Sequence, residues 1–205
     1  MQIVCLDFEG VIIPEIWVGL AEKLGIEKLK LTTREIKDYD ELMKIRLGVM
    51  DEHKLTIKDI QAVVDKLEPL EGAKDFLAKV REKYQTVILS DTFYEFIMPL
   101  MPKLNFPTVF CHRLDIESNG RIADYCLRMA DHKRHAVKAF HNLNFTVFAS
   151  GDSYNDTGML GEADRGFFFC APENVVKDFP QFPLVTDYDT LLDKFAAAGT
   201  DVAGK

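Results

Sequence analysis

The sequence predicts an α/β fold, in which a Rossmann-like parallel sheet is flanked by helices and a small helical-bundle cap is inserted after the first strand. Short apolar strand patterns alternate with amphipathic helix patterns along most of the chain, which is typical of a parallel sheet. A helical block from about residue 16 to residue 67 interrupts this alternation directly after the first strand. We therefore expect a core of residues 1–13 and 70–205 and a cap of residues 14–69.

The first strand is predicted over residues 1–6, where an apolar run is typical of a buried parallel strand. In the cap, one helix is indicated by residues at helical spacing: Ile36, Tyr39, Met43 and Met50. A second cap helix is predicted to begin at Thr56, because Asp59 three residues later completes a capping-box pattern. Pro69 and Gly72 then end the helical block.

The remaining elements belong to the core. They are predicted in this order: a helix over 73–84, a strand over 86–90, a strand over 108–114, a helix over 132–143, strands over 145–150 and 166–170, and a helix over 189–198. Residues 93–104 begin as a helix pattern, which Pro99 and Pro102 limit. The pair Asn119 and Gly120 is a turn pattern that predicts a β-hairpin.

Composition limits the classes of function. The 205 residues, of which 47% are hydrophobic, suffice for one domain with an insert and a sizeable core. The net charge of -8 argues against a nucleic acid partner. No apolar run approaches the ~18 residues of a membrane span, and the opening residues lack a signal-peptide pattern, so we expect a cytoplasmic protein with no membrane partner. The four cysteines form no CxxC pair, which predicts reduced thiols rather than disulfides or a zinc site.

Polar residues follow three of the predicted strands. Asp7 and Glu9 follow the first strand, Ser90 ends the strand over 86–90, and the segment GDSYND at 151–156 follows a third strand. In open parallel sheets, ligands bind beyond the carboxyl ends of the strands. We therefore expect these side chains to meet at one edge of the sheet.

The acids at this edge suit metal-assisted chemistry. Asp7, Asp152 and Asp156 offer the hard oxygen ligands that Mg²⁺ prefers. With a cation nearby, Asp7 stays ionised and can attack as a nucleophile. If the strand continues regularly, Glu9 lies on the same face as Asp7. It could then protonate a leaving oxygen and later activate water.

Two further residues suit a phosphoryl group. The Ser90 hydroxyl and the following backbone N–H groups could hold phosphate oxygens. Lys133, at the start of a predicted helix, could neutralise the charge of a transferring phosphoryl group, although Lys138 competes for this role. Each residue alone is ordinary: a turn acid, a helix cap or a surface lysine. Their order along the chain favours phosphoryl transfer through a phospho-aspartate.

The same residues resemble a known family. DFEGV at 7–11, Ser90, Lys133 and GDSYND at 151–156 are similar, in this order, to the four motifs of the haloacid dehalogenase superfamily of aspartate-nucleophile phosphatases. The resemblance covers the whole chain, and the helical insert has the position of the smaller helical cap of this superfamily. It implies that Asp7 is the nucleophile, that Glu9 is the acid and base, and that Ser90 and Lys133 stabilise charge. It also implies that Mg²⁺ is held by Asp7, by Asp152 and by the backbone carbonyl of Glu9. Asp156 would lie behind these ligands or be a weaker ligand itself.

Within the superfamily, the phosphoserine phosphatase branch is most similar. The resemblance implies that Glu15 and Arg46 hold the amino acid part of phosphoserine and that Asn155 touches the phosphate or the serine end. Arg46 also falls on an otherwise apolar helix face, where a charge needs a partner such as a carboxylate. The alternatives are that Arg46 extends to the helix rim and that Glu15 is a solvated hinge residue.

Three departures from the branch bear on function. Glu9 stands where most members have Asp, Asp91 where the branch has Gly, and Ser153-Tyr154 where it has Gly-Ala. They fit a variant of the family that also passes the phosphoryl group to homoserine, which implies roles in serine and threonine biosynthesis. Asp91 would then bind the amine of the incoming group or face away from the phosphate.

Other functions are weighed against this one. A phosphatase for another small metabolite, such as a sugar or nucleotide phosphate, shares nearly all these residues. Carbon–halogen hydrolysis needs neither a metal nor an acid at Glu9, and a signalling receiver domain has no place for the helical insert or for residues 151–156. The cap or an exposed sheet edge offers a surface for a homodimer.

Overall fold

The computed structural model describes residues 1–32, 36 and 38–203. Within them, one sheet has the strand order β4-β3-β2-β1-β5-β6-β7. The strands are β1 (Gln2–Leu6), β2 (Gln85–Phe93), β3 (Val109–Ile116), β4 (Ile122–Cys126), β5 (Thr146–Gly151), β6 (Arg165–Phe169) and β7 (Leu184–Val185). All neighbouring pairs are parallel except β3 and β4, which form the predicted antiparallel hairpin. The predicted α/β class is therefore confirmed.

The strand order places a crevice next to β1. From β1 the chain builds the sheet outward through β2 and β3 on one side and through β5, β6 and β7 on the other. Ligands bind at such a point of reversal, beyond the carboxyl ends of the strands. Asp7 follows β1 directly, so it lies at this point.

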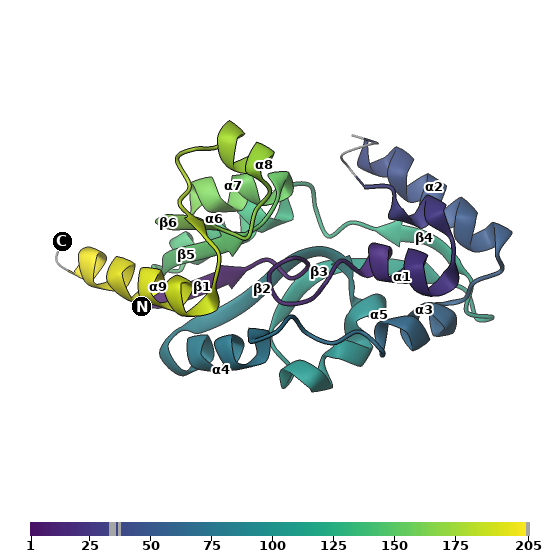
Figure 1. Cartoon of the computed structure of the whole chain (residues 1–205), viewed down its shortest axis with the longest axis horizontal. Helices are drawn as coiled ribbons and strands as arrows, with labels where there is room; N and C mark the ends of the chain where they lie inside the picture. The colour runs from purple at the N-terminus through teal and green to yellow at the C-terminus, as the bar shows by residue number, and fades with distance from the viewer. Residues whose placement is uncertain (33–35, 37, 204–205) are drawn as a thin grey trace.

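Helices cover both faces of the sheet (Figure 1). They are α4 (Ala73–Lys83) and α9 (Tyr188–Ala203) on one face, and α6 (His132–Asn142), α7 (Thr157–Glu162) and α8 (Glu173–Asp178) on the other. Successive side chains of β1 point to opposite faces of the sheet. Val4 and Leu6 pack into the cluster with α4 and α9. Ile3 and Cys5 pack into the cluster with α6, α7 and α8. A buried strand with two apolar faces reads as a continuous apolar run.

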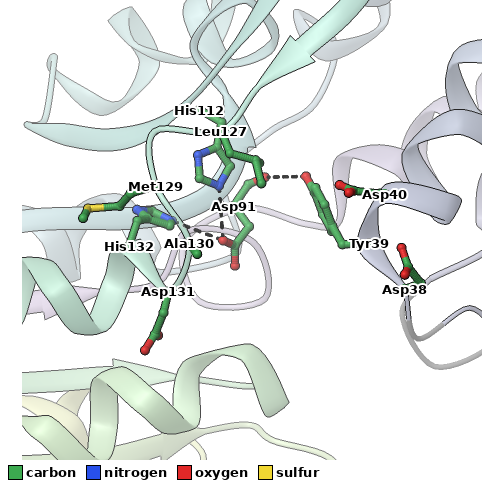
Figure 2. A pocket seen from close by; sticks show the side chains of 10 residues that line it. All are labelled: Asp38, Tyr39, Asp40, Asp91, His112, Leu127, Met129, Ala130, Asp131 and His132. Atoms are coloured by element: carbon green, nitrogen blue, oxygen red, sulfur yellow. Dashed lines mark hydrogen bonds and ion pairs between the residues drawn. The ribbon is translucent and has the colours of Figure 1, made fainter.

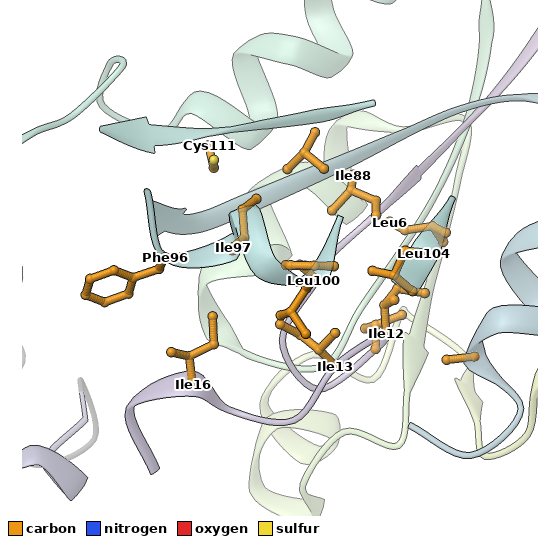
Figure 3. Packing of buried hydrophobic residues seen from close by; sticks show 14 of the residues in the cluster. Leu6, Ile12, Ile13, Ile16, Ile88, Phe96, Ile97, Leu100, Leu104 and Cys111 are labelled. Carbon is orange, nitrogen blue, oxygen red and sulfur yellow. The ribbon is translucent and has the colours of Figure 1, made fainter. Parts of the chain in front are cut away.

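The insert after β1 consists of α1 (Ile16–Leu24), η1 (Glu27–Lys30), α2 (Tyr39–Glu52) and α3 (Ile57–Val64). The chain enters it through Ile12, Ile13 and Ile16, which are buried against α5 (Tyr94–Ile97) and the turns η2 (Met98–Leu100) and η3 (Pro102–Leu104) (Figure 3). The insert therefore shares one hydrophobic cluster with the sheet. The division into a core and a cap with the bounds given above stays a prediction.

The hairpin β3–β4 holds the insert from the other side. Arg121 donates to both carboxylate oxygens of Asp51 on α2, at 2.8 and 2.7 Å. The Ile57 N–H at the start of α3 donates to the Gly120 carbonyl at 2.9 Å. The predicted capping box of Thr56 at the N-terminus of α3 is present.

Some element boundaries differ from prediction. β1 (Gln2–Leu6) confirms the strand predicted over residues 1–6, and it ends before Asp7, so the condition of a regular strand that continues to Glu9 is not met. α2 begins at Tyr39 and not at Ile36, because the Asp38 side chain accepts from the Glu41 N–H and caps the helix there. β2 continues three residues past Ser90 to Phe93, and α7, α8 and β7 were not predicted.

The cysteines and the helix lengths bear on the expected thiol state and on membrane crossing. The four cysteines are free, two of them buried and two exposed. Among the helices that the structure describes, none has both the length and the apolar character that a bilayer crossing requires.

Candidate active site

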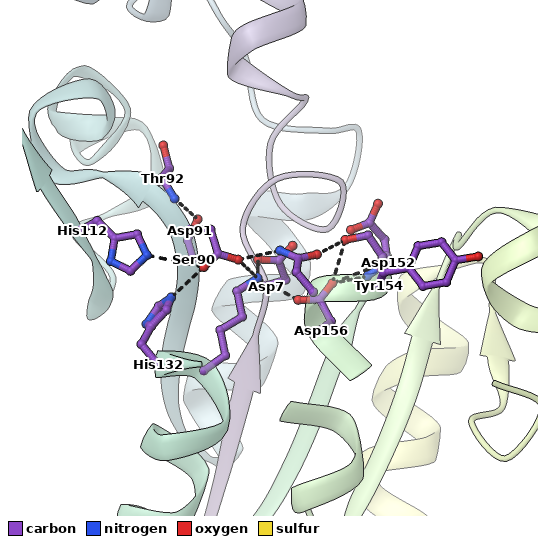
Figure 4. Close-up of polar contacts among 12 residues, drawn as sticks. Asp7, Ser90, Asp91, Thr92, His112, His132, Asp152, Tyr154 and Asp156 are labelled. Atoms are coloured by element: carbon purple, nitrogen blue, oxygen red, sulfur yellow. Dashed lines mark hydrogen bonds and ion pairs between the residues drawn. The ribbon is translucent and has the colours of Figure 1, made fainter. Parts of the chain in front are cut away.

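The carboxyl edge of the sheet brings the predicted acids together. Figure 4 shows Asp7 beside Asp156 and Asp152, with Ser90 on the neighbouring strand β2. The Asp7 N–H donates to the Ser150 carbonyl of β5 at 2.9 Å, which fixes Asp7 at the crevice. The residue is only 4% exposed. Residues far apart in sequence thus meet where the strand order reverses.

Lys133 is the cation of this cluster. Its Nζ lies 2.7 Å from Asp7 Oδ1 and 2.7 Å from Asp156 Oδ1, and the side chain is buried. Burial alone would lower the pKa of Lys133, but the charges of Asp156, Asp7 and Asp91 raise it well above its usual value. Lys138 instead faces Glu162 on the surface. The ammonium group at the nucleophile is therefore that of Lys133.

Asp156 organises the loop after β5. Its Oδ2 accepts from the backbone N–H groups of Asp152 at 3.0 Å and Ser153 at 3.1 Å, while its Oδ1 accepts from Lys133. It is fully buried and closes the capping box of the turn η4 (Tyr154–Asp156). These bonds occupy both oxygens, so Asp156 supports the loop and the lysine.

Two glycines make room for these carboxylates. A Cβ at Gly10 would overlap the Asp152 carboxylate, and Gly10 has a positive φ of 80° that other residues rarely adopt. A Cβ at Gly151 would overlap the Asp156 side chain. Only glycine lets the carboxylates lie where they do.

Glu9 lies on the insert side of Asp7. Its Oε1 accepts from the N–H of Ile16, the first residue of α1, at 2.7 Å. Burial, followed by the charge of Glu15, raises the pKa of Glu9 to about 8. A carboxyl group with this pKa carries a proton near neutral pH, as a general acid requires.

Arg46 on α2 is buried, with 7% of its surface exposed. Its guanidinium carbon lies 4.3 Å above the Trp17 ring, and Nη2 donates to the Leu31 carbonyl at 2.9 Å. Its Nε has no hydrogen-bond partner among the described residues. Burial lowers the pKa of Arg46 to about 10, against the attraction of Tyr39, Glu9 and Glu15. The alternative in which Arg46 extends to the helix rim is therefore wrong.

Of the remaining predicted residues, Glu15 lies at the N-cap of α1, and Ser90 and Asn155 lie next to Asp91. Ser90 is buried, and its Oγ accepts from the Thr92 N–H at 3.3 Å. Asn155 donates to Asp91 Oδ2 at 2.6 Å. Asp91 also lines an open pocket of about 430 Å³ (Figure 2). Its other lining residues are 38–40 of the insert and His112, Leu127 and residues 129–132.

Sequence reasoning missed two residues here, His112 on β3 and His132 at the start of α6. Both are buried and face Asp91. The only local signal was a histidine directly before Lys133 and another within an apolar strand.

Known proteins resemble this chain in sequence and in fold. Residues 1–164 match the family model of the haloacid dehalogenase-like hydrolases. The chain belongs to this family. Its place there makes it a hydrolase whose site is expected at the carboxyl edge of the sheet, where Asp7 lies.

Two curated relatives of this haloacid dehalogenase-like hydrolase cover nearly all of it. A protein named phosphoserine phosphatase from Pseudomonas syringae pv. tomato is 56% identical over 198 residues, which are 97% of this chain and 84% of the relative. A protein named phosphoserine phosphatase ThrH from Pseudomonas aeruginosa is 56% identical over 200 residues, which are 98% of both chains.

Solved structures share the fold. A phospho-aspartyl intermediate analogue of phosphoserine phosphatase superimposes with a TM-score of 0.77 at 18% identity, covering 94% of this chain and 98% of the other. A substrate-bound phosphoserine phosphatase complex gives 0.74 at 17% identity, covering 91% and 93%.

The acidic cluster of this hydrolase fits a hard divalent cation. Oxygen atoms of Asp7, Asp152 and Asp156 lie within 4.8 Å of one another. Burial, together with the Asp156 charge, raises the pKa of Asp7 above its usual value and that of Asp152 to about 7. A cation would offset this repulsion, and a set of carboxylate oxygens suits Mg²⁺.

Proposed function

We propose that the chain is a Mg²⁺-dependent phosphoserine phosphatase that acts through a phospho-aspartate on Asp7 and also transfers the phosphoryl group to homoserine. The observation that carries the proposal is the buried Arg46 at the insert side of the nucleophile, with a guanidinium nitrogen that has no partner in the described part of the chain. Such a group suits the carboxylate of an amino acid substrate. The names of the two relatives support the same substrate.

In the first half of the reaction, a carboxylate oxygen of Asp7 attacks phosphorus and the bond to the serine oxygen breaks. Glu9 donates its proton to that oxygen, so serine leaves as an alcohol. Lys133, held by Asp7 and Asp156, and the Ser90 hydroxyl stabilise the charge on the transferring group. Mg²⁺ held by Asp7, the carbonyl of Glu9 and Asp152 would neutralise part of the same charge.

In the second half, water or the hydroxyl of homoserine attacks the phospho-aspartate. Glu9, now a carboxylate, accepts the proton of the attacking oxygen, and Asp7 is released. Glu9 is therefore returned to its protonated form for the next turnover. Both acceptors use the space that serine vacates.

The amino acid part of the substrate is assigned to the insert. Arg46 would bind its carboxylate, Glu15 its ammonium group, and Asn155 would contact the phosphate or the serine end. We also propose that residues 14–69 act as a cap that excludes bulk water between the two steps. A cytoplasmic role in serine and threonine biosynthesis, and a homodimer, stay predictions.

The test is a reaction of the purified protein with phosphoserine and Mg²⁺, with and without homoserine. Free phosphate and phosphohomoserine are measured together. We expect phosphate in both reactions, and phosphohomoserine formed at its expense when homoserine is present. Phosphate alone would overturn the transfer activity, and no product of either kind would overturn the assignment of phosphoserine.

A further inference from the structure

Asp91 lies among four polar side chains, two at each carboxylate oxygen (Figure 4). Its Oδ1 lies 3.1 Å from His132 Nε2 and 3.5 Å from His112 Nε2. Its Oδ2 accepts from Asn155 at 2.6 Å and lies 3.4 Å from Lys133 Nζ. A carboxylate has about four acceptor sites. The contacts to His132 and Asn155 are hydrogen bonds, and those to His112 and Lys133 are longer ion pairs, so the four neighbours surround these acceptor sites.

The proton positions of the histidines follow from their other contacts. His112 Nδ1 accepts from the Arg128 N–H at 3.1 Å, so a neutral ring carries its proton on Nε2 and donates toward Asp91. His132 Nδ1 has no partner among the described residues, which leaves Nε2–H as the donor to Asp91. Burial would raise the pKa of Asp91, but Lys133, the two histidines and Asn155 hold it well below its usual value.

The same three side chains have the spacing of metal ligands, with ligand atoms within 4.8 Å of one another. A metal on His112 Nε2 needs the lone pair there, which moves the ring proton to Nδ1. That proton would point at the Arg128 N–H, a donor. A carboxylate with two N–H donors explains the geometry without this conflict.

We propose that Asp91, fixed by His112 and His132, is a positioning residue that holds Lys133 and Asn155 in place around the phosphoryl group. The inference rests on the proposed reaction at Asp7, but not on phosphoserine as the substrate.

Lys133 needs a third anchor because its partners change during the reaction. Its Nζ has three N–H groups, and two of them point to Asp7 and Asp156. When Asp7 becomes phosphorylated, the negative charge of its carboxylate is replaced by the charges of the phosphoryl oxygens, so the partner of Lys133 at this position changes from Asp7 Oδ1 to the phosphoryl group. Asp156 and Asp91 then remain as fixed anions on the ammonium group, which keeps it directed at the phosphoryl oxygens.

The main experiment compares Asp91→Asn with the wild-type protein, both loaded with Mg²⁺. Asparagine keeps the shape of the side chain but turns an N–H group or a neutral oxygen toward Lys133 and Asn155. We expect kcat to fall by about 10- to 100-fold for both phosphoserine and p-nitrophenyl phosphate, less than loss of a direct donor would cause. Inhibition by inorganic phosphate should weaken, because Lys133 and Asn155 are no longer held.

Variants of His132 distinguish a positioning role of Asp91 from a role in folding. His132→Leu should lower kcat by about tenfold, whereas His132→Gln, whose amide can donate, should restore most of it. The double variant with Asp91→Asn should be no slower than Asp91→Asn alone, because both changes act through one group. The matched control is Asp131→Asn, which lines the same pocket and has a φ of 49° that asparagine tolerates. It should stay within about twofold of wild type.

Three outcomes would overturn the inference. An Asp91→Asn variant with an unchanged kcat and tighter phosphate inhibition would show that Asp91 acts only through its charge. A loss confined to phosphoserine would place Asp91 on the amino acid part of the substrate. One equivalent of Zn²⁺ that is retained by wild type and lost in His132→Leu would show a metal site.

Failure of the proposed function has a different result. If Asp7→Asn hydrolyses p-nitrophenyl phosphate at the wild-type rate, the proposal that Asp7 is the nucleophile is wrong. If Asp7→Asn is inactive while Asp91→Asn is normal, only the inference about Asp91 fails.

Discussion

The two sides of the candidate site differ in how completely their charges are paired. On the core side, Lys133 lies between Asp7 and Asp156, and Asp156 also accepts two backbone N–H bonds. On the insert side, Arg46 is buried against Trp17 with one carbonyl partner for Nη2 and, among described residues, none for Nε. The core side therefore has its lysine paired before substrate binds, although its acids still repel one another. On the insert side we propose that a ligand completes the hydrogen bonds of Arg46.

The unpaired donor on the insert side lowers the stability of the unliganded protein. A buried donor without a partner costs about 1–3 kcal/mol, a cost that a substrate carboxylate would remove on binding. Changes on the core side should therefore reduce the chemistry of every phosphomonoester. Changes on the insert side should affect the choice among phosphomonoesters.

The largest expected effect is that of Asp7→Asn. It removes the nucleophile, and kcat should fall at least ~10⁴-fold for phosphoserine and for p-nitrophenyl phosphate alike. Phosphate release under saturating substrate measures it, with thermal unfolding as a check that the variant folds. A variant that loses activity toward only one of the two substrates would contradict the contrast between the two sides.

Glu9→Gln lies between the two sides and should come next. The amide cannot donate the proton that serine needs, so kcat for phosphoserine should fall by about 10²–10⁴-fold. Hydrolysis of p-nitrophenyl phosphate should fall much less in its first step, because nitrophenolate leaves without a proton. Burst kinetics with this substrate measures that step, and equal losses in the burst for both substrates would rule out Glu9 as the acid.

Arg46→Ala is the sharpest test of the insert side. The kcat/KM for phosphoserine should fall by about 10²–10³-fold, because the substrate carboxylate loses its charged partner. That for p-nitrophenyl phosphate should change by less than about threefold. The matched control is Lys44→Ala, an exposed cation on the same helix α2. If both substrates lose equally, Arg46 serves the phosphoryl group or the fold instead.

The smallest effect is expected at the contact between hairpin and insert. Arg121→Ala removes an exposed fork to Asp51 and should lower Tm by at most about 2–4 °C at pH 7, with little change in kcat/KM. The hydrogen bonds from Arg121 lower the pKa of Asp51 in the folded protein. This stabilisation is therefore present above the unfolded pKa of about 3.9 and is lost as pH falls through the folded value.

Thermal melts of Arg121→Ala and wild type should accordingly converge as the pH is lowered below about 4. A Tm difference that persists at low pH would show that Arg121 acts through packing and not through Asp51.

Sequence patterns predicted what depends on order along the chain. The alternation of strands and helices placed Asp7, Ser90 and Asp152 at one edge, and the structure confirms the α/β class that this rests on. Arg46 was predicted to be buried from its place on an apolar helix face, and it is.

What could not be predicted depends on contacts between distant segments. His112, Asp91 and His132 come from β3, β2 and the start of α6, and no spacing in the sequence links them. Local competition explains other errors. The cap formed by Asp38 outweighed the apolar series that placed the start of α2 at Ile36.

The two glycines beside the carboxylates have a consequence for tolerance to mutation. Gly10 and Gly151 carry no chemistry, yet any side chain there collides with Asp152 or Asp156. In a saturation library selected for activity, both positions should be as intolerant as Asp7. A position that such a screen finds indispensable can thus be required only because its residue has no side chain, while the adjacent carboxylate has the chemical role.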